Sequence, residues 1–314
     1  MSVVEKAIRK LQKQREQSAG ESQTPAVSQT AEVPQLSEPA PPHAAAAPAA
    51  SQPVVVLDRA TLRSAGLMPP DEEIDLITRQ YRKIKHPLVA RAMGRGVPRE
   101  PKGYLIMIAS AMSGEGKSFT SMNLALSLSL EKDLDVLLVD ADAPKPHLSR
   151  VMGLADAPGL LDVLRDPQRD VDSVIHATNV PFLSFMPAGV GGDDATELLS
   201  SPRMERTALL LGQRNSRRVV VFDSPPLLQT TESPALARAA GQIVVVVRAD
   251  STPQPVLLDA LNTLQGHSHT AVSLVLNQST QSGTAPYYYY GYEGKGGGIA
   301  PADARATVNN GPAS

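Results

Sequence analysis

Five of the chain's seven tyrosines, Tyr287, Tyr288, Tyr289, Tyr290 and Tyr292, stand within six residues near the C-terminal end. The surrounding sequence, GTAPYYYYGYEGKGGG, has no apolar period and too much glycine to pack into a core. Tyrosine normally lies where its ring is partly buried and its hydroxyl is paired. The position of these tyrosines therefore predicts that their hydroxyls are used chemically, and phosphorylation is a reaction that uses them.

A glycine-containing loop upstream could bind the nucleotide that donates the phosphate. The loop runs from Ala111 to Ser118, and its end, Gly116-Lys117-Ser118, matches the last three positions of the P-loop pattern. Glycines let backbone N–H groups approach phosphate, and a following helix presents its positive end to the anion. Ala111 replaces the first glycine of the general pattern, so an ordinary turn is the alternative. The position between a predicted strand and a predicted helix favours a nucleotide site.

Acidic residues end two other apolar runs. Asp140 and Asp142 follow the run DVLLV, and Asp223 follows VVVF in the arrangement known as Walker B. A single aspartate at such a place is commonly a helix cap. Two strand ends with this chemistry, together with the phosphate loop, predict Mg²⁺ and phosphoryl handling.

The elements that must position these motifs are predicted from apolar runs typical of strands buried on both faces. Helices are expected over 71–85, where Ile74, Ile77, Tyr81 and Ile84 recur at helical spacing, and from Lys117 to about Leu130. The alternation predicts an α/β fold with a mostly parallel sheet, helices on both faces, and ligands at the carboxyl ends of the strands. Together with the phosphate loop, it predicts a P-loop NTPase. The predicted strands are 104–110, 135–140, 182–188, 217–223, 242–249 and 271–277.

The chain is predicted to divide into four segments. Residues 1–16 form a basic amphipathic helix, for which a solvated terminus and docking to a partner or an anionic membrane surface are the alternatives. Residues 17–53, rich in Ala, Pro, Ser and Gln, are expected to be a disordered linker. Residues 54–280 form the P-loop domain, and 281–314 a flexible tyrosine-rich tail.

Composition excludes several classes of function. The formal net charge is −2, so no overall field favours nucleic acid, and the core segment has no basic–aromatic stripe. The absence of cysteine excludes disulfides and thiolate metal sites. The charged N-terminal sequence is unlike a signal peptide, and no run approaches the roughly 18 apolar residues of a spanning helix. A cytoplasmic protein is expected.

Together these motifs resemble the bacterial tyrosine kinases (BY-kinases) of exopolysaccharide synthesis, a branch of the P-loop ATPases related to the partition and division-site ATPases. That family combines a phosphate loop, a second acidic "A-prime" strand end, a Walker B aspartate and a C-terminal tyrosine cluster. The stretches GLLDVL (159–164), MPAG (186–189) and ELLSSPRM (197–204) are also similar to the family, so the resemblance covers residues 70–293. The N-terminal MSVVEKAIRKLQK and the following linker resemble the stand-alone autokinases of exosortase-type polysaccharide systems.

Three departures from the family pattern bear on function. Pro144, followed by a lysine, stands where a D-x-D-x-R pattern has arginine, and lysine lacks the planar bidentate fork. The helical E-x-x-R-x-x-R motif, which docks into a neighbouring subunit, is matched by Arg79, Arg82 and Lys85 without its glutamate. Met112 stands where partition ATPases carry a signature lysine, which argues against their mode of dimerisation.

The resemblance implies an ATP-dependent and Mg²⁺-dependent tyrosine autokinase. Lys117 would reach the β- and γ-phosphates, and Asp140 would orient or deprotonate the incoming tyrosine hydroxyl. Lys117, Asp140 and Asp142 are thus the predicted catalytic residues, and Ser118, Asp142 and Asp223 the predicted Mg²⁺ ligands, directly or through water. For Asn277, a cap at the end of the last strand is the alternative to adenine contact. The predicted nucleotide-contacting residues are Ser113, Gly114, Glu115, Gly116, Lys117, Ser118, Phe119 and Asn277.

Partners also follow from the resemblance. The acceptor tyrosines are expected on a neighbouring copy or on the same copy, so self-association is expected. Stand-alone family members are activated by the cytoplasmic segment of a membrane polysaccharide chain-length regulator, which would recruit this cytoplasmic chain indirectly to the inner face of the cell membrane. Two rival functions share the motifs: a partition-type ATPase switch, and an ATP-binding scaffold without kinase activity, which Pro144 favours.

Overall fold

A computed structural model describes residues 54–264 and 270–279. The predicted N-terminal helix, the linker and the tyrosine-rich tail lie outside these residues. Within the described ranges, no helix combines the length and apolar character needed to cross a membrane. The described residues therefore all lie within the predicted P-loop domain.

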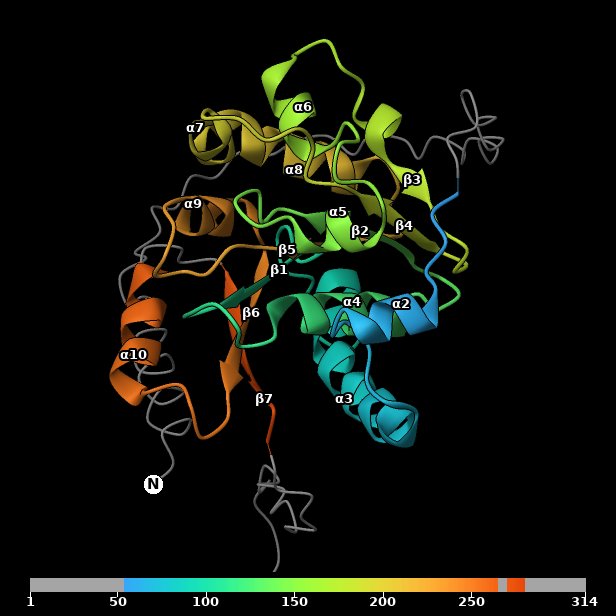
Figure 1. The fold of residues 1–314 in the computed structure, drawn as a ribbon, viewed down its shortest axis with the longest axis vertical. Helices are drawn as coiled ribbons and strands as arrows, with labels where there is room; N and C mark the ends of the chain where they lie inside the picture. Colours follow the sequence, from blue (N-terminus) through green and yellow to red (C-terminus); the bar gives the residue numbers. More distant parts are fainter. Residues whose placement is uncertain (1–53, 265–269, 280–314) are drawn as a thin grey trace, which may run out of the picture. The chain divides into compact units, whose positions relative to one another are not determined.

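From residue 105 onward, helices lie between most successive strands of the described chain, and two α-helices precede the first strand (Figure 1). The helices are α2 (Arg59–Ser64), α3 (Ile74–Met93), α4 (Lys117–Leu128), α5 (His147–Val151), α6 (Leu160–Arg165), α7 (Ala195–Ser200), α8 (Pro202–Gln213), α9 (Glu232–Ala239) and α10 (Gln254–Thr263), with 3₁₀ turns η1 (Asp71–Glu73) and η2 (Val171–Val174). The strands are β1 (Leu105–Ser110), β2 (Asp135–Asp140), β3 (His176–Ala177), β4 (Leu183–Met186), β5 (Arg218–Asp223), β6 (Gln242–Arg248) and β7 (Ala271–Asn277).

These strands form one sheet in the order β3-β4-β2-β5-β1-β6-β7. All neighbours pair in parallel except β3, which is antiparallel to β4. The central strands are continuous apolar runs because helices cover both of their faces. The predicted α/β fold with a mostly parallel sheet is confirmed.

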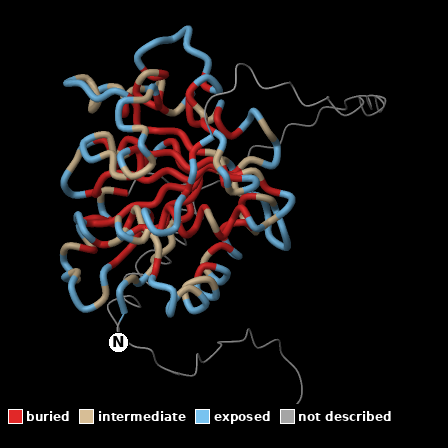
Figure 2. Tube along the Cα trace, turned by 45° about the vertical axis from the view of Figure 1, so that its right-hand side comes forward, coloured by how far each residue is buried: buried red, intermediate tan, exposed pale blue. Residues whose placement is uncertain are grey.

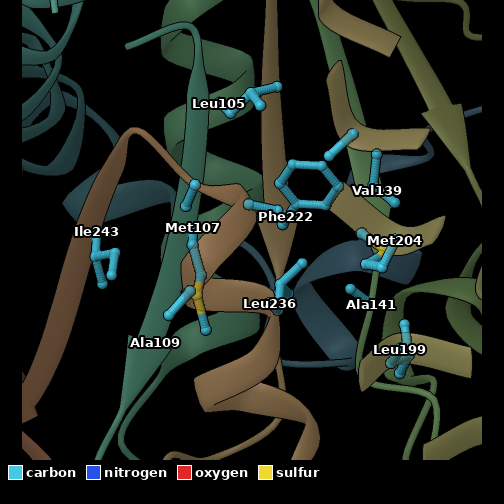
Figure 3. Close-up of a cluster of buried hydrophobic side chains, with 14 of the residues drawn as sticks. Leu105, Met107, Ala109, Val139, Ala141, Leu199, Met204, Phe222, Leu236 and Ile243 are labelled. Carbon is cyan, nitrogen blue, oxygen red and sulfur yellow. The ribbon is translucent and has the colours of Figure 1, made fainter. Parts of the chain in front are cut away.

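Alternate residues of each central strand enter two separate cores. On one face, Met107 and Phe222 pack with residues of α6 to α10, while on the other Ile106 and Val221 pack with residues of α2 to α5. Figure 1 shows α2, α3 and α4 on one side of the sheet and α6 to α9 on the other. Figure 2 shows the buried residues concentrated in the central strands. Figure 3 shows the Phe222 ring on the first face, near Met107 and Val139.

Strand order decides which motifs can meet. The strand β5 lies between β1 and β2, so the sheet places the Walker B aspartate between the phosphate loop and the A-prime aspartates. Asp140, the last residue of β2, is in register with Asp223, the last residue of β5. Because the strands are parallel, all three motifs lie at the same carboxyl edge.

Two elements differ from the sequence-based prediction. The helix expected over 71–85 begins as a 3₁₀ turn and continues as α3 through Pro87 to Met93. Proline lacks a backbone N–H and normally ends a helix, but here the helix continues and buries Leu88 and Val89 in the apolar core that α4 and the central strands share. The strand β3 was not predicted, because two residues at the sheet edge carry no periodic signal.

Candidate active site

The phosphate loop has the backbone that its glycines suggest. Gly114 and Gly116 have φ values of +83° and +96°, a region that favours glycine. A Cβ atom on Gly116 would lie 2.0 Å from Nδ2 of Asn277, so a larger residue would displace that side chain as well as strain the backbone. The loop leads into the N-terminus of α4, where free backbone N–H groups and the helix dipole favour an anion.

Glu115 connects this loop to two other strand ends. Its carboxylate accepts a hydrogen bond from the Met112 N–H at 2.8 Å through Oε2, and one from the Thr252 hydroxyl through Oε1. Asn277, the last residue of β7, donates its side-chain amide to the Glu115 carbonyl oxygen at 2.9 Å. The predicted nucleotide-contacting residues Glu115 and Asn277 therefore bind each other.

Lys117 and Ser118 open α4 beside the Walker B aspartate. Lys117 is only 7% exposed and forms no ion pair within the described part of the chain. Asp223 is almost fully buried, and its Oδ1 atom lies 2.9 Å from the Ser121 hydroxyl. Burial raises the pKa of Asp223 to about 6, against the opposing effects of Ser118, Lys117 and Ser121, which favour its ionised form.

Asp140 is buried completely and its carboxylate is already engaged. Its Oδ2 atom accepts hydrogen bonds from the backbone N–H and the hydroxyl of Ser149, at 2.8 Å and 2.7 Å. Its Oδ1 atom accepts a longer one from the Asp142 N–H at 3.3 Å. Burial, followed by the nearby charge of Asp223, raises the pKa of Asp140 to about 7. Any contact with a tyrosine hydroxyl would require these bonds to rearrange.

Asp142 is the more accessible of the two A-prime aspartates. It closes a turn in which its Oδ1 atom accepts a hydrogen bond from the Lys145 N–H at 3.2 Å. Pro144, at the position of the family arginine, is an exposed residue of this turn, and Lys145 is exposed beside it. Partial burial raises the pKa of Asp142, while Lys117 and then Lys145 act to lower it. Both cations thus lie close enough to influence this carboxylate.

The residues at this site suit Mg²⁺ better than they suit a metal ion whose ligands all come from protein side chains. Asp223 Oδ2 is buried and makes no hydrogen bond of normal geometry within the described residues, although the Ser118 hydroxyl lies close enough to favour the ionised carboxylate. This leaves an acceptor for an ion or its water. Ser118 and Asp142 supply further oxygen atoms nearby. Within residues 54–264 and 270–279, no group of three or more His, Cys, Asp or Glu is suited to hold a metal ion. Mg²⁺ accepts such a sparse set because it takes most of its ligands from water and phosphates.

Two residues near the site were not predicted from the sequence, because only contacts between distant parts of the chain place them there. Glu232, the first residue of α9, is 5% exposed and accepts a hydrogen bond from the Thr196 hydroxyl at 2.7 Å. The negative charge of Glu232 contributes weakly to raising the pKa of Asp142, so Glu232 lies near that carboxylate. In sequence it resembles an ordinary acidic residue in a first helical turn. Thr252 is the second of these residues, and no motif marked it.

The remaining predicted residues are placed as follows. Phe119 lies partly buried on the helix side of the loop, and its ring meets that of Tyr81 of α3 edge to face, with centroids 6.4 Å apart. Ser113 and Gly114 form the tip of the loop. The five clustered tyrosines lie outside the described residues. The structure thus places Lys117 near both Asp142 and Asp223, and Asp140 lies in register with Asp223 on the neighbouring strand.

Comparisons with known proteins show what the chain as a whole is similar to. The model of a family described as "AAA domain" matches residues 103–271. EpsB of Ralstonia nicotianae is 34% identical over 188 residues, covering 60% of this chain and 24% of EpsB. The tyrosine-protein kinase YwqD of Bacillus subtilis is 30% identical over 220 residues, covering 70% of this chain and 89% of YwqD. The succinoglycan biosynthesis transport protein ExoP of Rhizobium meliloti is 30% identical over 186 residues, covering 58% of this chain and 23% of ExoP.

A solved kinase-domain structure is also similar to this chain. The crystal structure of the VpsO kinase domain matches with a TM-score of 0.54 and 26% identity, covering 66% of this chain and 98% of that domain. The relatives have two lengths: the chain spans about a quarter of EpsB and ExoP but nearly all of YwqD. The similarity is therefore to a kinase domain that occurs within longer proteins and also makes up most of a shorter one.

Proposed function

Because this chain belongs to the bacterial tyrosine-protein kinases, we propose that it is an ATP-dependent autokinase that phosphorylates its own tyrosine cluster, Tyr287 to Tyr290 and Tyr292. One observation carries the proposal. At a single sheet edge, Lys117 and the start of α4 meet Asp223, whose buried Oδ2 atom makes no hydrogen bond of normal geometry within the described residues. That arrangement suits a nucleoside triphosphate with its metal ion, and the tyrosine cluster supplies acceptor hydroxyls in the same chain.

The loop would hold the phosphates of ATP. Its backbone N–H groups and the N-terminus of α4 attract the anion, and Lys117 adds a largely buried positive charge. Ser118, Asp142 and Asp223 would hold Mg²⁺, directly or through water, and the ion would neutralise charge on the phosphates. Catalysis in this reaction class is mainly positioning and charge stabilisation.

The bonds and the proton of the phosphoryl transfer can be assigned as follows to ATP, the tyrosine and the carboxylates of this chain. The tyrosine oxygen attacks the γ-phosphorus, the bond between that phosphorus and the β–γ bridging oxygen breaks, and ADP leaves. The phenolic proton, with an ordinary pKa near 10, goes late to a carboxylate. Asp140 stays the sequence-based candidate for this role, and it would have to exchange its Ser149 contacts. Asp142 is the candidate already accessible in the structure.

The biological setting is also proposed. ExoP is named for the transport of a polysaccharide during its synthesis, which supports a role for this chain in exopolysaccharide synthesis or export. The cytoplasmic segment of a membrane chain-length regulator would activate the kinase and recruit it to the inner face of the membrane. Self-association would let the tail of one copy enter the site of another.

A phosphotyrosine assay tests this function against its rivals. The purified chain is incubated with ATP and Mg²⁺, with and without the regulator's cytoplasmic segment, beside a variant with all five clustered tyrosines changed to phenylalanine. A kinase gives phosphotyrosine in the wild type and not in the variant. Steady ATP hydrolysis without phosphotyrosine would instead indicate the ATPase switch. ATP binding with neither product, even with the activating segment, would indicate the scaffold.

A further inference from the structure

A negatively charged side chain inside the phosphate loop is unexpected on electrostatic grounds. Glu115 lies between Gly114 and Gly116, in a loop that would hold a polyanion, and a free carboxylate there would repel it. Instead the residue is 4% exposed, and its carboxylate accepts hydrogen bonds from the Met112 N–H and the Thr252 hydroxyl. Both carboxylate oxygens are therefore engaged, one within the loop and one outside it.

Thr252 is held firmly enough to fix that carboxylate. It lies in the turn between β6 and α10, where its N–H donates to the Arg248 carbonyl oxygen at 3.1 Å. Its hydroxyl oxygen accepts the Arg248 N–H at 3.1 Å, which directs the hydroxyl hydrogen toward Glu115. Asp250 in the same turn has φ +54°, so the turn is tight. Thr252 thus has a defined orientation with Glu115 as its acceptor.

A second contact secures the same residue from β7. The Asn277 side chain donates to the Glu115 carbonyl oxygen at 2.9 Å, and the Asn277 carbonyl oxygen accepts the Ala249 N–H at 2.8 Å. The turn after β6, the end of β7 and the phosphate loop are therefore linked through Glu115. These contacts hold the loop in its observed shape.

We propose that Thr252 is a positioning residue for nucleotide binding. By holding the Glu115 carboxylate toward the β6–α10 turn, Thr252 keeps its charge from rotating toward bound phosphate and keeps the Met112 N–H oriented within the loop. This inference deepens the proposed function and rests on its nucleotide site. It implies that loss of the Thr252 hydroxyl weakens ATP and ADP alike, because both carry phosphates held by the loop.

Titration calorimetry with ATP and with ADP, both in the presence of Mg²⁺, tests the proposal on the full chain. Thr252→Val keeps the shape of the side chain without its hydroxyl, and Thr252→Ser restores the hydroxyl. Ser251→Ala, at an exposed neighbour in the same turn, is the matched control. Thr252→Val should raise both dissociation constants about tenfold, which is about 1.4 kcal/mol. The Ser variant and the control should stay within twofold of the wild type.

Two further readouts separate positioning from general structural damage. In a kinase assay, Thr252→Val should raise the KM for ATP while leaving kcat within about twofold, because the phosphates are held less well both before and during transfer. In a Glu115→Gln background, Thr252→Val should cost threefold or less, because no carboxylate charge remains to be held. Thermal unfolding of each variant verifies that it folds.

The outcomes decide clearly. A wild type that binds ATP and a Thr252→Val variant that binds it equally well would overturn the inference and leave the proposed function standing. An equal cost of Thr252→Val with and without Glu115 would also overturn it. A wild type that binds neither nucleotide would overturn both proposals.

Discussion

At the scale of single residues, the main feature is a pair of buried carboxyl groups at adjacent strand ends. Asp140 and Asp223 are in register, and both are almost completely removed from solvent. Burial is the first cause that raises their pKa values, to about 7 and about 6. Burying two carboxyl groups side by side costs stability when both are ionised, and the proposed binding of Mg²⁺ would offset that cost.

This pair predicts how stability depends on pH when nucleotide and Mg²⁺ are absent. In the unfolded chain aspartate titrates near 3.9, so the folded chain binds these protons more tightly. Their stabilising contribution is complete below about pH 4 and is lost as pH rises through about 6 and 7. We expect the thermal unfolding midpoint to decrease as the pH rises from about 4 to about 7, and Asp140→Asn to flatten this decrease. Melting curves followed by circular dichroism measure both slopes, and identical slopes would contradict the assignment.

Most of the site residues that were identified from the sequence belong to a local motif. Lys117, Asp142 and Asp223 follow strand ends with recognisable neighbours, and the structure brings them together. Ser149, Thr252 and Glu232 contact the site only through the fold, so their types and spacing in the sequence carry no signal. Asn277 was predicted with two alternatives, and the structure shows its side chain bound to the phosphate loop.

At the scale of elements, the strands that are buried on both faces were predicted to within one or two residues. Their signal is local, because a short continuous apolar run between turns is typical of a strand covered on both faces. Elements whose bounds depend on packing were predicted less well. The helix α3 passes through Pro87, and β3 consists of two residues paired at the sheet edge.

The helix α3 also uses one motif residue internally. Lys85 donates to the Ser127 carbonyl oxygen at 2.7 Å and pairs with Glu131 at 2.8 Å, so it joins α3 to α4. Of the three residues that match the docking motif, Arg79 and Arg82 are exposed and Lys85 is buried. Only the first two are therefore available at the surface for contact with another copy.

This contact predicts a stability effect that distinguishes neighbouring basic residues. Lys85→Met would remove both interactions and leave the Ser127 carbonyl oxygen buried, which should lower the free energy of unfolding by about 1–3 kcal/mol. Arg82→Met, on the exposed side of the same helix, should change it little. Urea unfolding of the two variants measures the difference. Equal effects would mean that Lys85 does not hold α3 on α4.

At the scale of the whole molecule, phosphorylation should change how copies associate. Each phosphate adds about −1.5 to −2 charges at neutral pH, so five would change the formal net charge from −2 to about −10 to −12. The modified tails would repel each other and the acidic groups of the site. We expect light scattering to give a lower average mass after full phosphorylation. An unchanged mass would contradict this prediction.

Mass spectrometry of the tail after incubation with ATP and Mg²⁺ is the most direct test of the central claim, with Lys117→Met in parallel. Because Lys117 is proposed to hold the phosphates of ATP, phosphate should be found on Tyr287 to Tyr290 and Tyr292 in the wild type and not in the variant. Equal tail phosphorylation in both proteins would place the chemistry elsewhere. No phosphate in either, even with the regulator's cytoplasmic segment present, would contradict the claim that this chain is an autokinase.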